Sequence, residues 1–431
     1  MLGKNENERL SLVGPGTPAG ALQRRYWHVV AAVDELAERW TKRVRLLGED
    51  LVLFRDRSGK LGLIAEQCPH RRASFAYGIP EADGIRCPYH GWQFDGSGRC
   101  IDQPNEPPES SFKDKVTATA YPVEVLGGLV WAYLGPAPVP LLPRWDGFVG
   151  EGMIRACGWH HVTCNWLQIM ENSLDPIHTQ WLHGALLEFL EENSGLKIPA
   201  AKKQLKIAFD EFEYGVYKRR LLEGQSEDAD DWKVGHPVIF PNLLAVGSGG
   251  GHLWKVLAYQ IRVPTDDEHT MHYWYFAFEP PAGAQVPPHL FDRLSFYRMP
   301  VRDANGEYIL DTIGVQDVMA WETQGARAKR ELERLGTTDE GVIMWRQLLS
   351  RELAKVEAGQ DPMGVVRDPA KNVRIEFAVE RDKSNFTDGF DRVLKRSSLR
   401  SAPIAGELRT LFAAYNGERL AKSLREPVSA G

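Results

Sequence analysis

The stretch that decides the fold runs from Cys68 to His90 and reads CPHRRASFAYGIPEADGIRCPYH. It begins with Cys68-Pro69-His70 and, after sixteen intervening residues, ends with Cys87-Pro88-Tyr89-His90. Each end supplies one thiol and one imidazole, so the stretch as a whole offers two cysteine and two histidine ligands. A ligand set of this kind can hold one inorganic cluster.

The arrangement of these ligands distinguishes two kinds of metal site. Two thiolates can bind one iron of a [2Fe-2S] cluster while two imidazoles bind the other, which is the Rieske arrangement. A structural zinc site competes, because Cys2His2 sets also bind tetrahedral zinc. Zinc motifs usually pair like with like, as C-x2-C and then H-x3-5-H. Here each half is mixed, C-x-H and then C-x2-H, so the pattern favours the [2Fe-2S] cluster.

The composition limits the remaining possibilities. The chain has 431 residues, which predicts two or three domains, and 43% hydrophobic and 26% charged residues, which is typical of a globular protein. A net charge of −6 argues against nucleic acid as a partner. We find no apolar run long enough for a transmembrane helix and no signal peptide, so we expect a cytoplasmic protein. The other cysteines, Cys100, Cys157 and Cys164, are expected to be reduced, buried thiols.

The chain divides into three segments by pattern, and the fold class that they predict is α+β. Residues 1–37 are expected to form a leader that packs on the catalytic domain. Residues 38–150 have short strands and frequent turns, which predicts a small antiparallel β domain with the ligand loops at one end. Residues 151–431 contain strand-like runs and then helical patterns, which predicts an antiparallel sheet covered by helices. The expected strands span 206–209, 215–221, 237–240, 253–263 and 271–278, and a helix carries Val342, Trp345, Leu349 and Leu353.

A second set of metal ligands follows in the pattern D-x2-H-x4-H, formed by Asp175, His178 and His183. Two imidazoles and one carboxylate are the ligands of the non-haem Fe(II) facial triad, which leaves coordination positions open for O2. The spacing of five residues puts His178 and His183 about 140° apart on a regular helix. They can meet at one metal only if the helix is broken or bulged there. Asp175 shares a face with His178 and is better placed to orient it than to bind the metal.

The triad therefore needs a carboxylate from elsewhere, and Asp317 is the candidate. It is expected to open a helix beside several apolar residues, where an unpaired acid would be unfavourable. The alternative is an acid at a helix N-terminus that only complements the helix dipole. The residues alone leave both interpretations open.

Taken together, these features resemble the oxygenase (α) subunit of the Rieske non-haem iron ring-hydroxylating oxygenases, and within them the phthalate dioxygenase branch. The resemblance covers nearly the whole chain. It rests on the cluster loops with Gly91-Trp92, the segment from Asn172 to His183 and the stretch 316–325, and on less specific matches in the leader, at 13–18 and 25–27, and at 235–237. It implies a Rieske domain followed by a catalytic domain of the helix-grip type.

The resemblance also implies a role for each of these residues. Cys68 and Cys87 would bind one iron of the cluster, and His70 and His90 the other. The mononuclear Fe(II) would be bound by His178, His183 and Asp317. Asp175 would connect a Rieske histidine of a neighbouring subunit to His178, which implies a homotrimer or a hexamer of stacked trimers. Asn172 occupies a near-iron position in some members of the family.

The implied activity is that of a terminal oxygenase that uses O2 and electrons from an NAD(P)H-dependent reductase. We expect cis-dihydroxylation of an aromatic carboxylate; the alternatives are O-demethylation or aryl-ether cleavage, and a Rieske electron carrier without catalysis. The 280 or so residues beyond the cluster domain argue against the carrier. Lys218-Arg219-Arg220 could anchor an acidic substrate, although such clusters are usually solvated. Strand alternation would send Lys218 and Arg220 to one face and Arg219 to the other.

Overall fold

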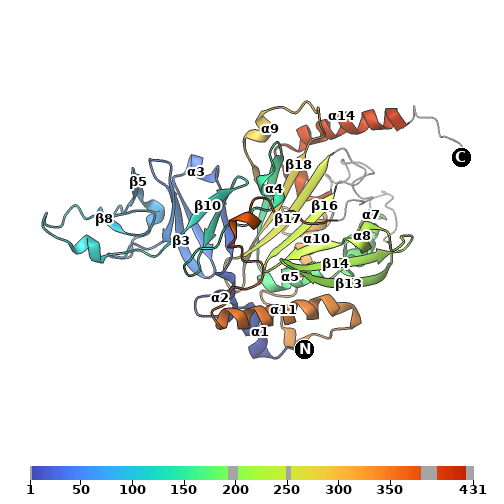
Figure 1. The fold of residues 1–431 in the computed structure, drawn as a ribbon, viewed down its shortest axis with the longest axis horizontal. Coiled ribbons are helices and arrows are strands. Elements are labelled where there is room, and N and C mark those ends of the chain that lie inside the picture. The colour runs from blue at the N-terminus through green and yellow to red at the C-terminus, as the bar shows by residue number, and fades with distance from the viewer. Residues whose placement is uncertain (1, 193–201, 249–253, 380–395, 424–431) are drawn as a thin grey trace.

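The computed structural model describes residues 2–192, 202–248, 254–379 and 396–423 of the chain. Figure 1 shows two parts, a narrow β-rich part formed by the N-terminal third and a broader part with one large sheet and most of the helices. No helix in these described ranges is long and apolar enough to cross a membrane. The α+β architecture predicted from the sequence is confirmed.

The N-terminal part contains three small antiparallel sheets. Their strand orders are β1(Trp27–Ala32)-β11(Leu129–Tyr133)-β10(Val123–Leu126), β2(Thr41–Leu46)-β3(Glu49–Arg55)-β4(Leu61–Ala65)-β9(Ala120–Tyr121), and β5(Ile79–Glu81)-β6(Gly84–Arg86)-β7(Gln93–Phe94)-β8(Cys100–Asp102). The β2–β3 hairpin turns at Leu47 and Gly48, whose φ angles of 50° and 78° fit the two-residue turn that such hairpins favour. A separate core of Phe54, Phe75 and Phe94 fills the space beside the cluster loops.

The first residues connect the two parts. Helices α1(Lys4–Ser11) and α2(Pro18–Gln23) pack against α11(Glu340–Glu357) of the larger part. Thr17 caps α2, with its hydroxyl accepting from the Gly20 amide at 3.1 Å and Pro18 at the first helical position. Strand β1, by contrast, pairs with β11. Sheet pairing in the N-terminal part therefore begins before residue 38, where the sequence pattern places the start of the β domain.

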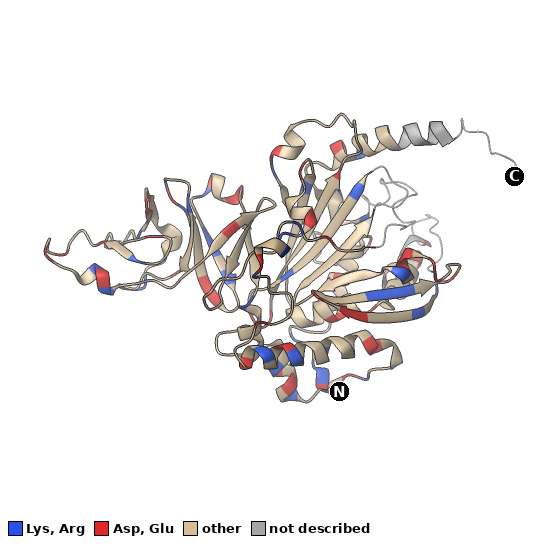
Figure 2. Ribbon diagram, in the orientation of Figure 1, with Lys and Arg blue, Asp and Glu red and all other residues tan. Residues whose placement is uncertain are grey.

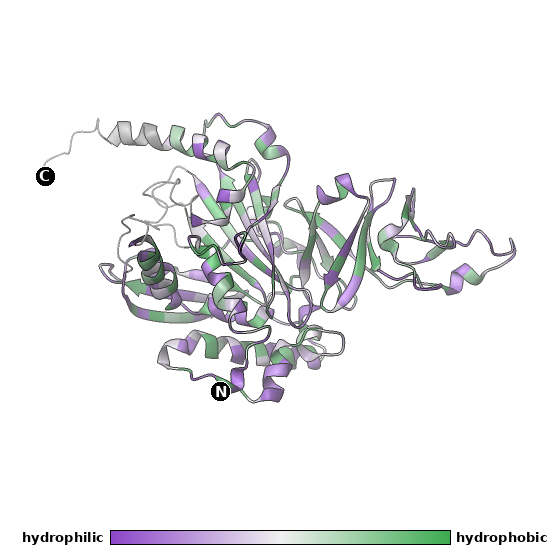
Figure 3. Ribbon diagram, turned by 180° about the vertical axis from the view of Figure 1, so that it is seen from behind, coloured by the Kyte–Doolittle hydropathy of each residue, from purple (hydrophilic) through white to green (hydrophobic). Residues whose placement is uncertain are grey.

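The larger part is built on a sheet of eight strands. Their order is β13(Gln204–Phe212)-β14(Gly215–Leu222)-β15(His236–Ile239)-β16(Leu243–Ser248)-β17(Lys255–Pro264)-β18(Thr270–Glu279)-β12(Ile154–Val162)-β19(Ser295–Arg298). All neighbours are antiparallel except β12 and β19, which are parallel. After β18 the chain reverses and adds β19 on the far side of β12, so β19 runs parallel to β12. The sheet therefore differs at this edge from the antiparallel sheet that we expected. Figure 3 shows hydrophobic stretches along these strands.

Helices and turns cover this sheet and link its strands. The elements around the site are α5(Trp166–Leu174), α6(His178–Gln180), the π-helical turn η3(Trp181–Ala185), α7(Leu186–Glu192) and α10(Ile313–Glu322). The other helices and turns of the larger part are α4(Asp146–Val149), α8(Asp230–Lys233), α9(His289–Asp292), η4(Arg330–Leu332), η5(Thr337–Asp339), η6(Pro369–Lys371), η7(Ser398–Ser401) and α14(Ala405–Ser423). The N-terminal part has the short elements α3(Glu35–Glu38), η1(Phe75–Tyr77) and η2(Phe112–Lys115). The predicted apolar stripe of α11 is confirmed, because Val342, Trp345, Leu349 and Leu353 are buried.

A buried ion-pair cluster fixes α5, the helix that leads into the second metal site. Glu171 accepts hydrogen bonds from Arg330 Nη2 at 2.8 Å and from Arg346 Nε at 2.6 Å. Arg330 Nη1 also donates to the side chain of Asn7 on α1 at 2.8 Å. Burial tends to raise the pKa of Glu171, but the two guanidinium groups outweigh it and hold the pKa below its usual value. These ion pairs therefore join the leader, α5 and α11 through the ionised carboxylate of Glu171.

The three cysteines outside the cluster motif, Cys100, Cys157 and Cys164, are buried and form no disulfide. Their predicted placement as buried thiols is confirmed. Burial raises the pKa of each thiol above its usual value, so all three are protonated and unreactive near neutral pH.

Candidate metal centres

The two cluster loops are tight turns closed by backbone hydrogen bonds. The Cys68 amide donates to the Ala73 carbonyl at 2.8 Å, and the Cys87 amide donates to the Trp92 carbonyl at 2.8 Å. Gly91 has a φ of 80°, and a Cβ atom there would lie 2.9 Å from the Pro104 ring. Glycine is therefore the residue that lets the second loop turn directly after its last ligand.

The loops present two thiols towards the interior and two imidazoles towards the outside. Cys68 and Cys87 are buried, whereas His70 is exposed. The imidazole ring centroids of His70 and His90 lie 4.6 Å apart, and His70 stacks on Trp92 at 4.3 Å. Burial and the neighbouring Cys87 thiol raise the pKa of Cys68 to about 12, and the buried Nδ1 of His90 has no hydrogen-bond partner. Two adjacent buried thiols and an orphaned imidazole nitrogen fit ligation of a [2Fe-2S] cluster.

The spacing of these ligands fits a single zinc ion less well. With Zn–N and Zn–S bonds of about 2.0–2.3 Å, a tetrahedral ion draws its four ligand atoms to within about 4 Å of one another. Within the described ranges, three potential ligands have atoms that all lie within 4.8 Å of one another: His178, His183 and Asp317. The four residues of the cluster loops do not form such a close group. This geometry favours a two-iron cluster at the loops and points to a mononuclear site elsewhere.

The mononuclear site begins where α5 ends. Pro176 forces the preceding Asp175 into an extended conformation, with ψ at 111°, which terminates the helix. His178 opens the short helix α6, and His183 lies in the π-helical turn η3. There the Leu186 amide donates to the Trp181 carbonyl, five residues back. The predicted break or bulge is confirmed, and the widened turn brings His183 to the side on which His178 lies.

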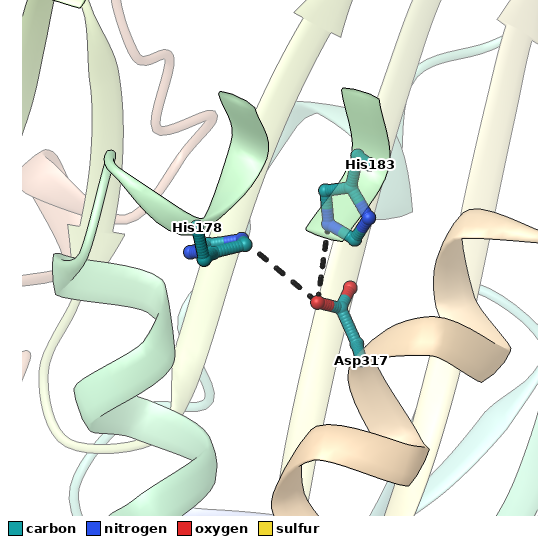
Figure 4. Close-up of side chains that lie close together, drawn as sticks. All are labelled: His178, His183 and Asp317. Atoms are coloured by element: carbon teal, nitrogen blue, oxygen red, sulfur yellow. Dashed lines mark ion pairs between the residues drawn. The ribbon is translucent and has the colours of Figure 1, made fainter. Parts of the chain in front are cut away.

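Figure 4 shows both imidazoles directed at the carboxylate of Asp317 from α10. The Nε2 atoms of His183 and His178 lie 3.2 Å and 3.8 Å from Asp317 Oδ1. Bonds of about 2.1 Å to one metal at angles of about 90–130° place ligand atoms about 3.0–3.8 Å apart. Asp317 Oδ1 is buried and makes no hydrogen bond, although it faces two nitrogens. Three lone pairs that converge in this way fit a facial metal triad.

A glutamine that the sequence reasoning did not single out orients His183. Gln316 Oε1 lies 2.9 Å from His183 Nδ1, and Gln316 Nε2 donates to the Leu310 carbonyl at 2.8 Å. The carbonyl can only accept, so it fixes the amide with its oxygen towards the imidazole. His183 therefore donates from Nδ1 and keeps the lone pair of Nε2 for a metal. Its position next to Asp317 in the chain was the only sequence signal for this role.

The position of Asp317 differs from the prediction in one respect. Helix α10 begins at Ile313, so Asp317 lies in its second turn and does not open the helix as expected. The alternative that Asp317 merely complements the dipole at a helix N-terminus is weakened, because that interaction is confined to the first turn. Burial tends to raise the pKa of Asp317, but His183 and His178 hold it below its usual value. The group is a carboxylate near neutral pH, as a metal ligand must be.

Asp175 and Asn172 lie at the end of α5 beside this triad. Asp175 Oδ2 is 3.4 Å from His178 Nδ1, on the side of the ring that faces away from Asp317. Its other oxygen accepts from the Ile177 amide at 2.7 Å, and 30% of its side chain is exposed. This position fits the predicted orienting role. No hydrogen bond of the described residues joins the Asn172 side chain to the triad, and its role stays a prediction.

The basic run on β14, part of the blue on this strand in Figure 2, divides by its partners as strand alternation predicts. Arg219 forms an ion pair with Asp210 at 3.0 Å. Arg220 contacts Asp231 at 3.0 Å and the Thr179 hydroxyl at 3.2 Å. Lys218 is buried, and its charge acts on both histidine ligands. Burial lowers the pKa of His178, and the Lys218 charge adds to this effect. At His183 burial and the Lys218 charge act in the same direction, but they are outweighed by Asp317 and Gln316, which raise its pKa. The run is therefore not simply a solvated face.

Comparisons with known proteins agree with both centres. Residues 26–122 match the family model of the Rieske [2Fe-2S] domain, and residues 162–354 match that of the vanillate O-demethylase oxygenase C-terminal domain. The chain is 42% identical to the 5,5'-dehydrodivanillate O-demethylase oxygenase subunit of Sphingobium sp. (strain NBRC 103272 / SYK-6), over 89% of this chain and 88% of that protein. The chain belongs to the Rieske non-haem iron oxygenases.

One further relative of this Rieske oxygenase supports the assignment, and one solved structure shows the same fold. The phthalate 4,5-dioxygenase oxygenase subunit of Pseudomonas putida is 31% identical over 84% of this chain and 89% of its own length. The terminal oxygenase of carbazole 1,9a-dioxygenase from Nocardioides aromaticivorans IC177 shares the fold, with a TM-score of 0.57 and 21% identity, over 81% of this chain and 97% of that one.

As a member of this family, the chain is the terminal oxygenase component of a multicomponent Rieske oxygenase. Its cofactors are a Rieske [2Fe-2S] cluster and a mononuclear iron, and it uses O2 and electrons supplied by a reductase. The expected family, enzyme class and cofactors are thus confirmed. The alternatives of a zinc protein and of a carrier without catalysis are wrong for this Rieske oxygenase.

Proposed function

We propose that this oxygenase removes the methyl group from a methoxylated aromatic carboxylate. The observation that carries the proposal is the 42% identity to an O-demethylase oxygenase subunit over 89% of the chain. The match of residues 162–354 to the vanillate O-demethylase C-terminal domain supports the same chemistry. The sequence pattern placed cis-dihydroxylation first and O-demethylation second, and the comparisons favour the reverse order.

A second candidate is cis-dihydroxylation of an aromatic carboxylate. The relative named phthalate 4,5-dioxygenase, 31% identical over 84% of this chain, favours it. Both candidates take an aromatic acid and differ in the bond that oxygen attacks.

The balance of the demethylation is that of a monooxygenase. One methoxyarene, one O2, two electrons and two protons give one phenol, one formaldehyde and one water. The C–H bond of the methyl group is oxidised, the O–CH3 bond breaks, and one atom of O2 is reduced to water. The two electrons correspond to one NAD(P)H, oxidised by the reductase.

We assign the ligands by the geometry above. Cys68 and Cys87 would hold one iron of the cluster, and His70 and His90 the other. The mononuclear iron would be bound by His178, His183 and Asp317. When bound, the mononuclear iron supplies the activation of O2, with electrons received from the cluster. The chain itself orients the imidazoles, keeps Asp317 ionised and shields the site from water.

The two centres of one chain lie far apart in the fold. In Figure 1, β5 and β8, which lie beside the cluster loops, stand at the end of the molecule remote from α10. We therefore propose that electrons pass between subunits of a trimer or hexamer, from an exposed Rieske histidine to Asp175 of a neighbour. The exposure of His70 and of 30% of the Asp175 side chain supports this route. We also propose a division into a leader, a Rieske domain that ends near residue 150, and a catalytic domain at 151–431. Because β1 pairs with β11, we place the start of the Rieske domain before residue 38 and shorten the leader accordingly.

The test is product analysis with the holoenzyme, a reductase and NADH. With 3-methoxybenzoate as substrate we expect one formaldehyde and one phenol for each NADH oxidised. A cis-diol without formaldehyde would replace this proposal by the second candidate. The Asp317→Ala variant serves as the control that must lose product formation.

A further inference from the structure

Arg262 is a fully buried cation close to the mononuclear site. It lies on β17 with an exposed fraction of 0%. Its Nη2 donates to Gln260 Oε1 at 2.7 Å, and its Nη1 lies 3.8 Å from the Met170 sulfur on α5. Its Nε is buried without a hydrogen-bond partner. The neighbours that hold the guanidinium are neutral.

The charge of Arg262 is not neutralised by an ion pair. No Asp or Glu of the described residues forms a salt bridge with it. Asp317 is near enough to act on it through its charge, and it raises the pKa of Arg262 against the larger effect of burial, which lowers the pKa to about 9. The carboxylate of Asp317 is itself directed at His178 and His183. Arg262 therefore stays protonated near neutral pH without a counter-ion in direct contact.

A second polar group stands beside it on the same face of the sheet. His272 on β18 is paired directly across from Arg262, and directly paired residues share a face. His272 is fully buried, and neither of its ring nitrogens has a hydrogen-bond partner. Two tryptophans flank its ring, Trp274 with centroids 4.0 Å apart and Trp321 with centroids 5.2 Å apart. The Nε atom of Arg262 and both ring nitrogens of His272 thus lack hydrogen-bond partners among the described residues, on one face of the sheet and next to two tryptophan rings.

This arrangement is unfavourable unless something completes it. Buried charges in proteins are paired, because an unpaired ion loses its hydration without compensation. Buried imidazole and guanidinium nitrogens are likewise expected to be hydrogen-bonded. A planar carboxylate offers two acceptor oxygens in the geometry that a guanidinium group prefers. An aromatic ring attached to that carboxylate would find tryptophan side chains beside it.

The face of β17 that carries Arg262 is less deeply buried two and four residues before it. Strand alternation puts Ala258, Gln260 and Arg262 on one face of β17, and Ala258 and Gln260 are only half-buried. The amide of Gln260 therefore connects the accessible part of this face to the buried guanidinium. A ligand that reached Gln260 would next meet Arg262.

We propose that Arg262, with His272 beside it, binds the carboxylate of the substrate and sets the specificity of this oxygenase for aromatic acids. The inference deepens the proposed function and rests on it. Arg262 is a specificity-determining residue: it holds the carboxylate of the ring, so that the methoxy group is turned towards the metal ligands. Arg219 and Arg220 are excluded as principal anchors, since each already has a carboxylate partner.

The test compares two probes of nearly equal shape on the holoenzyme, 3-methoxybenzoate and the neutral 3-methoxybenzamide, by titration calorimetry. We expect the wild type to bind the carboxylate about ten- to a hundredfold more tightly, as a charge-assisted hydrogen-bonded pair implies. Arg262→Met should remove this preference and leave amide binding nearly unchanged. Arg219→Gln is the control. It removes one positive charge from the ion pair with Asp210 and should keep the preference for the carboxylate.

Two further measurements separate a binding role from a structural one. Because Arg262 has no ion pair to lose, Arg262→Met should not lower the thermal stability of the unliganded enzyme. Arg262→Lys keeps the charge but not the planar fork, so it should retain part of the preference. A wild type without carboxylate preference overturns the inference, and so does an Arg262→Met enzyme that keeps the preference. If Arg262→Met fails to fold, the carboxylate preference of the wild type and its partial loss in Arg262→Lys test the inference instead.

Failure of the inference and failure of the proposed function give different results. Equal binding of both probes together with formaldehyde release would overturn the role of Arg262 and leave O-demethylation standing. A carboxylate preference that depends on Arg262, without formaldehyde release, would support the anchor and overturn O-demethylation.

Discussion

Replacing Gln316 by Leu tests whether the iron site depends on the residue that orients its histidine. In the wild type, Gln316 Oε1 accepts from His183 Nδ1 at 2.9 Å, and its amide group donates to the Leu310 carbonyl at 2.8 Å. Leucine is of similar size but makes neither hydrogen bond. The imidazole then loses the partner that fixes its ring orientation and its tautomer, while Asp317 and His178 are unchanged.

The expected magnitude follows from these two contacts. A single neutral hydrogen bond contributes about 0.5–1.5 kcal/mol, and a buried polar group left unpaired costs about 1–3 kcal/mol. Loss of the partner that orients a metal-binding histidine weakens metal affinity about 10- to 100-fold. We therefore expect Gln316→Leu to bind mononuclear Fe(II) about 10- to 100-fold more weakly. The cluster should be unaffected, because its ligands lie in the other part of the molecule.

The assay is Fe(II) titration of enzyme from which the mononuclear iron has been removed, with the Rieske visible and EPR spectra recorded on the same sample. Gln324→Leu is the matched control, since the exposed Gln324 follows α10 and, within the described part of the chain, its side chain donates to the Ala320 carbonyl at 3.0 Å and to no metal ligand. Unchanged iron affinity in Gln316→Leu would refute the orienting role. Equal losses in both variants would show that the effect comes from the helix and not from the contact to His183.

Three further results are expected. Glu171→Gln should lower the free energy of unfolding by about 3–5 kcal/mol in denaturant titrations, because it leaves the buried Arg330 guanidinium without its carboxylate, while Arg346 keeps Glu333 as a partner. Since the folded-state pKa of Glu171 lies below its unfolded value, this difference is fully present above about pH 4.3 and shrinks as the pH falls further, and a pH-independent difference would contradict the ion pairing. Cys87→Ser should abolish the Rieske spectrum, and an unchanged spectrum would remove this residue from the cluster. Asp175→Asn should slow electron transfer to the mononuclear site in stopped-flow measurements while both metal contents stay normal; wild-type transfer rates would exclude Asp175 from the route.

The parts of the site that the sequence predicted are those set by local spacing. The two mixed Cys/His pairs were visible because each lies within one loop. The distortion between His178 and His183 could be inferred because five residues cannot place two ligands on one side of a regular helix, and the π-helical turn supplies the needed change. The residues alone left Asp317 open between a metal ligand and an acid that complements a helix dipole, and the family resemblance favoured the ligand. Local spacing could not decide, because the meeting of Asp317 with these histidines depends on the packing of α10 against η3.

The parts that were missed depend on contacts between distant segments. Gln316 and Arg262 are ordinary polar residues in the sequence, and only the packed structure shows that one faces His183 and the other is buried without an ion pair. The parallel pairing of β19 with β12 joins strands more than a hundred residues apart. The start of α10 at Ile313 also escaped the pattern, since no side-chain cap marks it.

The most direct test of the two-centre account is the iron and sulfide content of the wild type and of Asp317→Ala, measured on the same preparations as their EPR spectra. The account predicts three irons and two sulfides per wild-type chain, two irons in the cluster and one at the mononuclear site. Asp317→Ala should keep the two sulfides, two irons and the Rieske spectrum while the third iron is lost. A variant that retains three irons, or one that loses the cluster together with the third iron, would contradict the assignment of Asp317.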